Sequence, residues 1–127
     1  MKREVNNSHE LKDNNGKNNI HLVVIIPAYN EEKTIGDVIR SIPRNCARKV
    51  EVLVVNDGSQ DRTEEVALAA GADRVFAHNT NKGLGITFKD GIDEGLRMGA
   101  DIIVNIDADG QFDTNDIPRL VRPILDK

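Results

Sequence analysis

The sequence predicts an α/β domain in which a parallel β-sheet is covered by helices on both faces. Short runs of β-branched and apolar residues alternate along the chain with patterns that have the 3.6-residue period of a helix. The runs are apolar throughout, which is typical of strands buried on both faces. Strands that alternate with helices are joined by crossover connections, and such connections link parallel strands.

Length and composition limit the classes of protein that fit. The 127 residues are sufficient for one domain. Lys and Arg number 17 against 21 Asp and Glu, and the net charge of -4 disfavours a nucleic-acid partner. The single cysteine, Cys46, excludes an internal disulfide framework and fits a cytoplasmic protein. No apolar run reaches the roughly 20 residues that cross a bilayer.

Residues 1–19 are expected to form a disordered polar tail, and residues 20–127 the domain. The tail is rich in asparagine and charge and has few apolar groups, so it cannot bury enough surface to offset the entropy of ordering. A short helix that docks on a partner is the alternative. The first strand is expected at His21–Ile26 and is expected to stop at Pro27, because proline cannot donate to a sheet.

The first helix is expected to follow Asn30 as its N-cap and to end before Pro43. Glu31 and Glu32 would then lie in its first turn, where negative charge suits the helix dipole. Its apolar positions have the spacing of one buried helix face: Ile35, Val38, Ile39 and Ile42.

A second strand is expected at Val50–Val55, followed by a helix that ends at Gly71. Asp61 and Glu64 have the spacing of a capping box at the start of that helix. Asp57 differs, because it follows the strand directly and precedes Gly58, a residue type that lets a ligand approach the backbone closely. We therefore interpret Asp61 as structural and Asp57 as a binding residue.

The third strand is expected at Arg74–His78, with no catalytic role for His78. A helix over Leu84–Met98 follows, closed by Gly99. Its internal glycines, Gly91 and Gly95, are expected to allow close packing on the sheet. Lys82, just before this helix, is either a phosphate contact at the helix N-terminus or a solvated loop residue.

The fourth strand, expected at Asp101–Ile106, leads directly into Asp107, Ala108 and Asp109. Because successive side chains of a strand point to opposite faces, both carboxylates are expected to project to one side, where they could hold Mg²⁺ or Mn²⁺. The amide of Gln111 could add an oxygen ligand. Solvated loop charges or a helix cap are the alternative interpretation of such a pair. A last helix is expected to begin at a Thr114 or Asn115 cap, to accept Pro118 in its first turn, and to be disturbed by Pro123.

Ligands of parallel α/β sheets collect at the carboxyl ends of the strands. This rule brings together the loop at residues 27–31, the Asp57 loop and the acidic segment at residues 107–111. Their convergence predicts a site for a nucleotide whose diphosphate is bridged by a metal ion.

Four motifs, read together, resemble family 2 glycosyltransferases of the GT-A fold, a Rossmann-like three-layer arrangement. They are Pro27-Ala28-Tyr29-Asn30-Glu31-Glu32, Asn56-Asp57-Gly58-Ser59-Gln60-Asp61-Arg62-Thr63, Asn81-Lys82-Gly83 and the Asp-x-Asp motif Asp107-Ala108-Asp109-Gly110-Gln111. The chain looks most like the dolichol-phosphate mannose synthase branch. The resemblance implies a hexosyltransferase that moves a sugar, with inversion, from a UDP- or GDP-sugar to an acceptor such as a polyprenyl phosphate.

The resemblance also implies roles for individual residues. Pro27, Tyr29 and Glu31 match the loop that holds the base and ribose, and Asp57 matches a further nucleoside contact. Asp107, Ala108 and Asp109 match the diphosphate-binding segment, and the metal ligands would be Asp107, Asp109 and Gln111. Asn56 stands where family members often have Asp.

The chain ends at Lys127, before the position where the family places its catalytic base and acceptor site. It is therefore expected to be a truncated, donor-binding part of the GT-A domain, from a parent protein at the cytoplasmic face of a membrane. The family strand order 3-2-1-4 would leave the fourth strand at an uncovered sheet edge, through which self-association is expected.

Three other classes of protein are alternatives to a transferase. A non-catalytic module that binds nucleotide-sugars fits the same motifs. A nucleotidyltransferase that makes sugar nucleotides is expected to carry a glycine- and arginine-rich loop after the first strand, and Pro27-Ala28-Tyr29-Asn30 is not one. Dinucleotide-dependent redox chemistry needs Gly-x-Gly-x-x-Gly at that point, which this sequence lacks.

Overall fold

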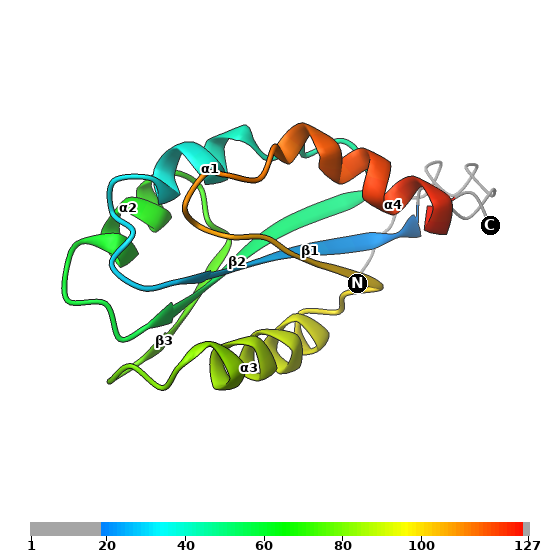
Figure 1. Ribbon diagram of the computed structural model, residues 1–127. Helices are drawn as coiled ribbons and strands as arrows, with labels where there is room; N and C mark the ends of the chain where they lie inside the picture. The colour runs from blue at the N-terminus through cyan, green and yellow to red at the C-terminus, as the bar shows by residue number, and fades with distance from the viewer. Residues whose placement is uncertain (1–18, 126–127) are drawn as a thin grey trace.

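A computed structural model describes residues 19–125 and confirms the α/β class. Four parallel strands form one sheet in the order β3-β2-β1-β4 (Figure 1), as the resemblance implied. Nearly all of the predicted polar tail, residues 1–18, lies outside the described residues. The strands are β1 (His21–Ala28), β2 (Lys49–Asp57), β3 (Arg74–His78) and β4 (Ile102–Asn105).

Helices cover both faces of the sheet and complete three layers (Figure 1). One face is covered by α1 (Ile35–Ser41), α2 (Thr63–Ala69) and α4 (Ile117–Leu125), and a short 3-10 helix, η3 (Thr114–Asp116), leads into α4. The other face is covered by α3 (Leu84–Arg97). Within residues 19–125, no helix combines the length and the apolar character needed to span a membrane.

The side chains of β1 alternate between two hydrophobic clusters. Leu22, Val24 and Ile26 pack with α1, α2 and α4, whereas Val23 and Ile25 pack beneath α3. All five side chains have no exposed surface. A central strand buried on both faces explains why this stretch of sequence is continuously apolar.

The strand β1 continues through Pro27, so the prediction that Pro27 stops it is wrong. The carbonyl of Ile25 accepts a hydrogen bond from the Ile106 amide on the β4 side, at 3.0 Å. Pro27 follows Ile25 by two residues and therefore faces the same side. Because β4 ends at Asn105, opposite Ile25, the missing N–H of Pro27 breaks no bond in the sheet.

Two predicted helix caps are also wrong. Asn30 does not cap α1, which begins at Ile35 after Thr34; its φ of 54° and its side chain serve a loop contact instead. Glu31 and Glu32 therefore precede the helix and do not lie in its first turn. Before α4, neither Thr114 nor Asn115 is the cap.

At the start of η3, the carboxylate of Asp113 accepts a hydrogen bond from the Asn115 amide at 3.0 Å and is the true cap. The Thr114 hydroxyl instead donates to Ser41 Oγ, 2.7 Å away on α1. The helix α4 includes Pro118 in its first turn, as predicted, and continues through Pro123.

The capping box predicted at Asp61 and Glu64 is wrong, because the N-cap of α2 is Arg62 and its side chain makes no capping hydrogen bond. The structural role of Asp61 and the packing role of the glycines in α3 are confirmed. Asp61 is structural, since its carboxylate accepts hydrogen bonds from the amide and the hydroxyl of Thr63 at the start of α2. Gly91 and Gly95 allow close packing, because a Cβ added at them would lie 2.9 Å from Ile25 and 3.3 Å from Ile103, respectively.

Candidate functional site

The loops that follow β1 and β2 are joined by reciprocal hydrogen bonds. The Asn30 amide donates to Ser59 Oγ at 2.9 Å, and the Gln60 amide donates to Asn30 Oδ1 at 2.8 Å. The Glu31 amide donates to the hydroxyl of Thr63 at 2.8 Å. These contacts account for the left-handed backbone of Asn30, which turns its amide and its side chain toward the neighbouring loop.

The loop after β4 is attached to the same structure through Thr34. The Thr34 hydroxyl donates to the carbonyl of Ala108 at 2.7 Å. Ala108 is 2% exposed and packs in the core cluster with α1, whereas Asp107 and Asp109 on either side of it are exposed. The three loops are thus held together at the carboxyl ends of β1, β2 and β4, as predicted.

Asp57, at the end of β2, is 5% exposed and has three hydrogen-bond donors. Its Oδ1 accepts from the Lys82 amide and from His78 Nδ1, each at 2.8 Å, and its Oδ2 accepts from the Gly83 amide at 3.0 Å. Burial opposes ionisation, but the bonds from Lys82, His78 and Gly83 outweigh it and lower the pKa of Asp57. Asp57 is therefore an ionised, rigidly held acceptor.

Gly58 permits this arrangement. Its φ is +74°, and a Cβ at this position would lie 2.5 Å from the Asn81 amide nitrogen and 2.5 Å from the Thr80 carbonyl carbon. Only a residue without a side chain lets the loop after β2 lie this close to the segment that supplies the donors to Asp57.

A cavity of about 240 Å³ opens beside Asp57. Asp57 lines this cavity together with Pro27 and Tyr29, the two residues that the resemblance assigns to the base and ribose. Its walls are apolar apart from a few polar groups, which suits a flat ligand with hydrogen-bonding edges. The lining residues are Pro27, Ala28, Tyr29, Asp57, Asn81, Gly83, Leu84 and Thr87.

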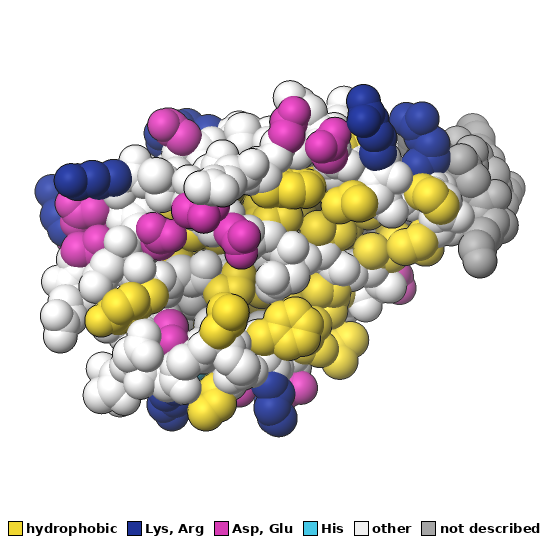
Figure 2. Space-filling model, in the orientation of Figure 1, with side chains coloured by type: hydrophobic (Ala, Val, Ile, Leu, Met, Phe, Trp, Pro, Cys, Tyr) yellow, Lys and Arg dark blue, Asp and Glu magenta, His cyan; other side chains and the backbone are white. Residues whose placement is uncertain are grey.

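A second group of side chains at the strand ends is acidic: Glu31, Asp61, Asp107 and Asp109. Burial raises the pKa of Glu31, and the charges of Asp109, Asp61 and Asp107 raise it further. Figure 2 shows acidic side chains gathered at the end of the molecule where the strands terminate. These carboxylates are close enough to interact, and their mutual repulsion would be relieved by a cation.

The prediction that strand alternation orients Asp107 and Asp109 is wrong. Because β4 ends at Asn105, strand alternation does not orient Asp107 and Asp109. They lie in a turn in which Asp109 Oδ1 accepts a hydrogen bond from the Gln111 amide at 3.0 Å. The burial of Ala108 between them leaves both carboxylates exposed.

These residues fit a divalent cation that shares its ligands with a substrate. Within the described part of the chain, no three His, Cys, Asp or Glu side chains form a complete metal site. The exposed carboxylates of Asp107 and Asp109 have the chemistry of a partial ligand shell. Mg²⁺ commonly binds proteins through one or two carboxylates plus substrate phosphates.

The loop at residues 27–31 connects the two parts of the site. Tyr29 lines the Asp57 cavity, and Glu31 belongs to the acidic group. Two residues of chain span at most about 7 Å. A nucleoside in the cavity would thus place its phosphates toward the acidic group.

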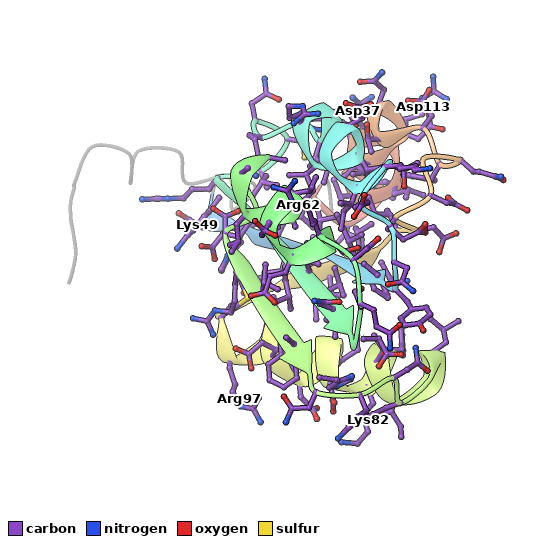
Figure 3. All side chains as sticks on the ribbon, turned by 90° about the vertical axis from the view of Figure 1, so that its left-hand side faces the viewer. Asp37, Lys49, Arg62, Lys82, Arg97 and Asp113 are labelled. Atoms are coloured by element: carbon purple, nitrogen blue, oxygen red, sulfur yellow. The ribbon has the colours of Figure 1, made fainter. Side chains whose placement is uncertain are left out.

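Lys82 is not positioned as a phosphate ligand. Its amide and that of Gly83, at the start of α3, already donate to Asp57, so the chain's own carboxylate occupies this helix N-terminus. In Figure 3, which looks onto the carboxyl ends of the strands, the Lys82 side chain lies at the margin of the molecule beside α3. The solvated interpretation of Lys82 fits the structure better.

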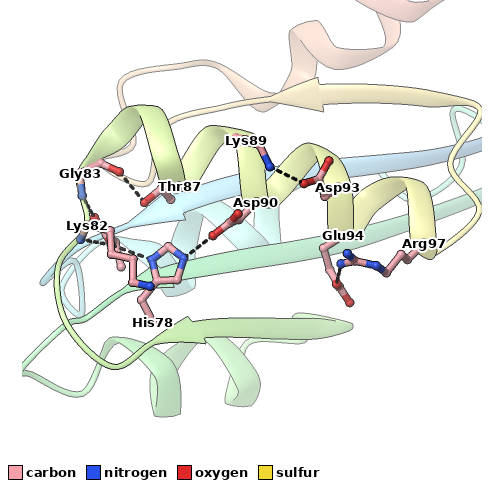
Figure 4. A network of polar contacts seen from close by, with 10 residues as sticks. His78, Lys82, Gly83, Thr87, Lys89, Asp90, Asp93, Glu94 and Arg97 are labelled. Atoms are coloured by element: carbon pink, nitrogen blue, oxygen red, sulfur yellow. Dashed lines mark hydrogen bonds and ion pairs between the residues drawn. The ribbon is translucent and has the colours of Figure 1, made fainter.

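Sequence reasoning missed His78 and Asp90. His78 is 8% exposed, and its ring lies between Asp57 and Asp90, with Nε2 at 2.7 Å from Asp90 Oδ2 (Figure 4). Asp57 and His78 are register partners on adjacent strands. A correct alignment of β2 with β3 is the one signal that would have placed them together.

Comparisons with known proteins show the family and agree with the fold. The family model described as glycosyl transferase family 2 matches residues 23–127. Polyprenol monophosphomannose synthase of Mycolicibacterium smegmatis is 41% identical over 105 residues, which cover 78% of this chain and 39% of that protein. UDP-N-acetylglucosamine–dolichyl-phosphate N-acetylglucosaminyltransferase of Methanococcus voltae is 32% identical over 120 residues, covering 82% and 47%.

Among solved structures, glucosyl-3-phosphoglycerate synthase from Mycobacterium tuberculosis, in complex with Mn²⁺, UDP-glucose and phosphoglyceric acid, superposes with a TM-score of 0.71 at 34% identity. The match covers 87% of this chain and 41% of that one. The chain thus spans less than half the length of these similar proteins.

Proposed function

Because this chain belongs to glycosyl transferase family 2, we propose that it is the donor-binding part of a hexosyltransferase that uses a nucleotide-sugar and a divalent cation. The base and ribose occupy the cavity beside Asp57, between Pro27 and Tyr29. The diphosphate lies along Asp107, Ala108 and Asp109.

The observation that carries this proposal is the pairing of two unlike surfaces on one short loop. Tyr29 faces an apolar cavity that ends in an ionised Asp57, and Glu31 faces a group of acids with unrelieved charge. A nucleoside diphosphate with its cation has the matching parts in the matching order. The Mn²⁺ and UDP-glucose named for the M. tuberculosis synthase support this assignment.

Asp107 and Asp109, with the amide of Gln111, would hold the Mg²⁺ or Mn²⁺ ion. Asp109 Oδ1 accepts a hydrogen bond from the backbone amide of Gln111, which leaves Asp109 Oδ2 for the cation. The acidic group concentrates negative charge around this position, and this charge favours the binding of a cation. When bound, a divalent cation would neutralise the negative charge that develops on the departing nucleoside diphosphate.

For the acceptor we propose a polyprenyl phosphate. The names of the M. smegmatis and M. voltae relatives specify a polyprenol and a dolichyl phosphate. A phosphate nucleophile is already anionic, so attack with inversion on the sugar requires less help from a general base than attack by a hydroxyl. Such an acceptor would bring the enzyme to the cytoplasmic face of a membrane.

The test is calorimetric titration with UDP and with GDP, each with and without Mg²⁺ or Mn²⁺. We expect cation-dependent binding that weakens at least about tenfold in Asp109→Asn, because one charged ligand is removed. The matched control is Asp37→Asn, which makes the same charge change on α1 at a side chain that is 85% exposed, and it should bind like the wild type.

Absence of binding to both nucleotides would overturn the proposal, as would equal binding by Asp109→Asn and the wild type. Transfer of labelled sugar from a UDP- or GDP-sugar to a polyprenyl phosphate then separates a transferase from a module that only binds the donor.

A further inference from the structure

His78 is held between two carboxylates that come from different layers of the fold. Nδ1 lies 2.8 Å from Asp57 Oδ1 on β2, and Nε2 lies 2.7 Å from Asp90 Oδ2 on α3 (Figure 4). The His78 and Asp57 side chains are 4% and 6% exposed, whereas that of Asp90 is 28% exposed. The three side chains form a chain from the donor cavity to a partly exposed position on α3.

Only the doubly protonated imidazolium can donate to both carboxylates at once. A neutral ring would direct a lone pair at one of them. The hydrogen bond to Asp57 raises the pKa of His78; burial opposes this, and the bond to Asp90 and both negative charges reinforce it. Two lysines belong to the same part of the fold: the backbone amide of Lys82 also donates to Asp57, and Lys89, next to Asp90 on α3, pairs with Asp93 at 3.0 Å.

The orientation of Asp57 depends on this ring. Its other donors, the amides of Lys82 and Gly83, belong to the loop that leads into α3, so they hold the carboxylate from one segment only. His78 supplies the donor from the sheet. Its own position is fixed by the register of β3 against β2 and by Asp90.

We propose that His78 and Asp90 are positioning residues for the donor's base: the imidazolium, held by Asp90, sets the orientation and charge environment of Asp57 in the cavity. Neither residue lines that cavity or touches the ligand. This inference rests on the proposed function. It predicts that nucleotide affinity depends on pH through His78, which lies outside the cavity.

The expected behaviour is a loss of nucleotide affinity as pH rises and His78 loses its proton. Asp90→Asn keeps an oxygen opposite Nε2 but removes the charge, so the loss should occur at lower pH and affinity at neutral pH should fall about tenfold. His78→Asn keeps an amide donor near Asp57 but cannot ionise, so this part of the pH dependence should disappear. A purely structural pair would change stability and leave the pH profile of binding unmoved.

The experiment is titration with UDP and GDP, with the cation that supports binding, from weakly acidic to weakly alkaline pH. Asp93→Asn is the matched control, because it removes one carboxylate from the same helix, where Asp93 pairs with Lys89 at 3.0 Å on the surface. The affinity of Asp93→Asn should depend on pH as that of the wild type does. Titration of the nucleotide phosphates affects all variants equally, so this comparison also controls for it. Circular dichroism checks that each variant is folded.

Two failures are distinguishable. If the wild type binds neither nucleotide, the proposed function falls and the inference falls with it. If the wild type and Asp93→Asn bind with cation dependence, and Asp90→Asn has the same affinity and pH profile, the inference alone is overturned. Should His78→Asn not fold, the partly exposed Asp90→Asn substitution decides the question.

Discussion

Two carboxylates at the strand ends, Asp57 and Glu31, have pKa values displaced in opposite directions. Asp57 is buried and Glu31 is half-buried, and burial opposes the ionisation of both. Hydrogen bonds to Asp57 reverse this effect, whereas Glu31 has three acidic neighbours that add to it. At the scale of single residues, the site therefore combines a fixed anion for a neutral ligand group with a surplus of charge for a cation.

The substitution Glu31→Gln should raise the free energy of unfolding at neutral pH, without cations, by about 0.5 kcal/mol. The raised pKa of Glu31 means that its ionised form destabilises the folded state at high pH. The gain should shrink as pH falls through the folded pKa and should vanish below the unfolded value of about 4.3. Urea denaturation at several pH values measures it.

Glu65→Gln is the control for that experiment, because the Glu65 side chain on α2 is exposed and pairs with Arg62 at 3.3 Å. It should show no gain. Equal effects of the two substitutions would contradict the account of the acidic group.

Gly58→Ala should destabilise the protein by about 3 kcal/mol, because both backbone strain and a backbone clash are introduced. Gly71→Ala is the matched control, with a φ of +108° but no atom within 4 Å of the added Cβ. It carries the strain without the clash and should cost about 1 kcal/mol. Chemical denaturation compares them, and equal costs would argue against the close approach of the two loops.

At the scale of elements, the apolar runs predicted every strand, and the periodic patterns predicted every α-helix. The ends were less predictable, because they depend on contacts between loops. Asn30 has the chemistry of a cap, but Ser59 and Gln60 from the next loop fix it elsewhere. Pro27 has the chemistry of a strand terminator, but its neighbouring strand has already ended.

The candidate site was predictable only in part for the same reason. Asp57 is the last residue of β2, and Asp107 and Asp109 lie in the turn after β4. A general rule about parallel sheets places all three at one end of the sheet. His78 and Asp90 lie 21 and 12 residues from their partners, and no local pattern marks them. Their role depends on register and on the rotation of α3, which the sequence pattern does not fix.

The packing of α3 on the sheet gives a prediction at this scale. Gly91→Ala should destabilise the protein despite the better helix propensity of alanine, because its Cβ would lie 2.9 Å from Ile25 Cγ2 and 3.3 Å from Val55 Cγ2. We expect a net cost of about 1–3 kcal/mol. In the same helix Gly85→Ala meets nothing within 4 Å and should be neutral or stabilising by up to about 1 kcal/mol. Thermal unfolding of both variants tests this prediction. A Gly91→Ala variant that is more stable than the Gly85→Ala variant would contradict it.

At the scale of the whole molecule, β4 forms an edge of the described sheet and pairs only with β1 within residues 19–125. Apolar side chains extend over the face that carries this edge (Figure 2). Phe88 on α3 and Leu120 on α4 are 46% and 52% exposed. Unpaired edges beside apolar surface favour association with another chain.

We therefore predict that this chain, studied alone, self-associates with increasing concentration in sedimentation experiments. The double substitution Phe88→Gln and Leu120→Gln should reduce that association, because it removes exposed apolar area from α3 and α4. Leu68→Gln, on α2 at a position that is 51% exposed, is the control and should leave it unchanged. A concentration-independent monomer would contradict the prediction.

The central claim is that one nucleotide spans the Asp57 cavity and the acidic group. A crystal structure of the protein with UDP and Mn²⁺, with the metal located by its anomalous scattering, tests this most directly. We predict the base beside Asp57, between Pro27 and Tyr29, and the Mn²⁺ ion bound to Asp109 and the diphosphate. A base outside that cavity, or a metal ion with no contact to Asp107 or Asp109, would contradict the claim.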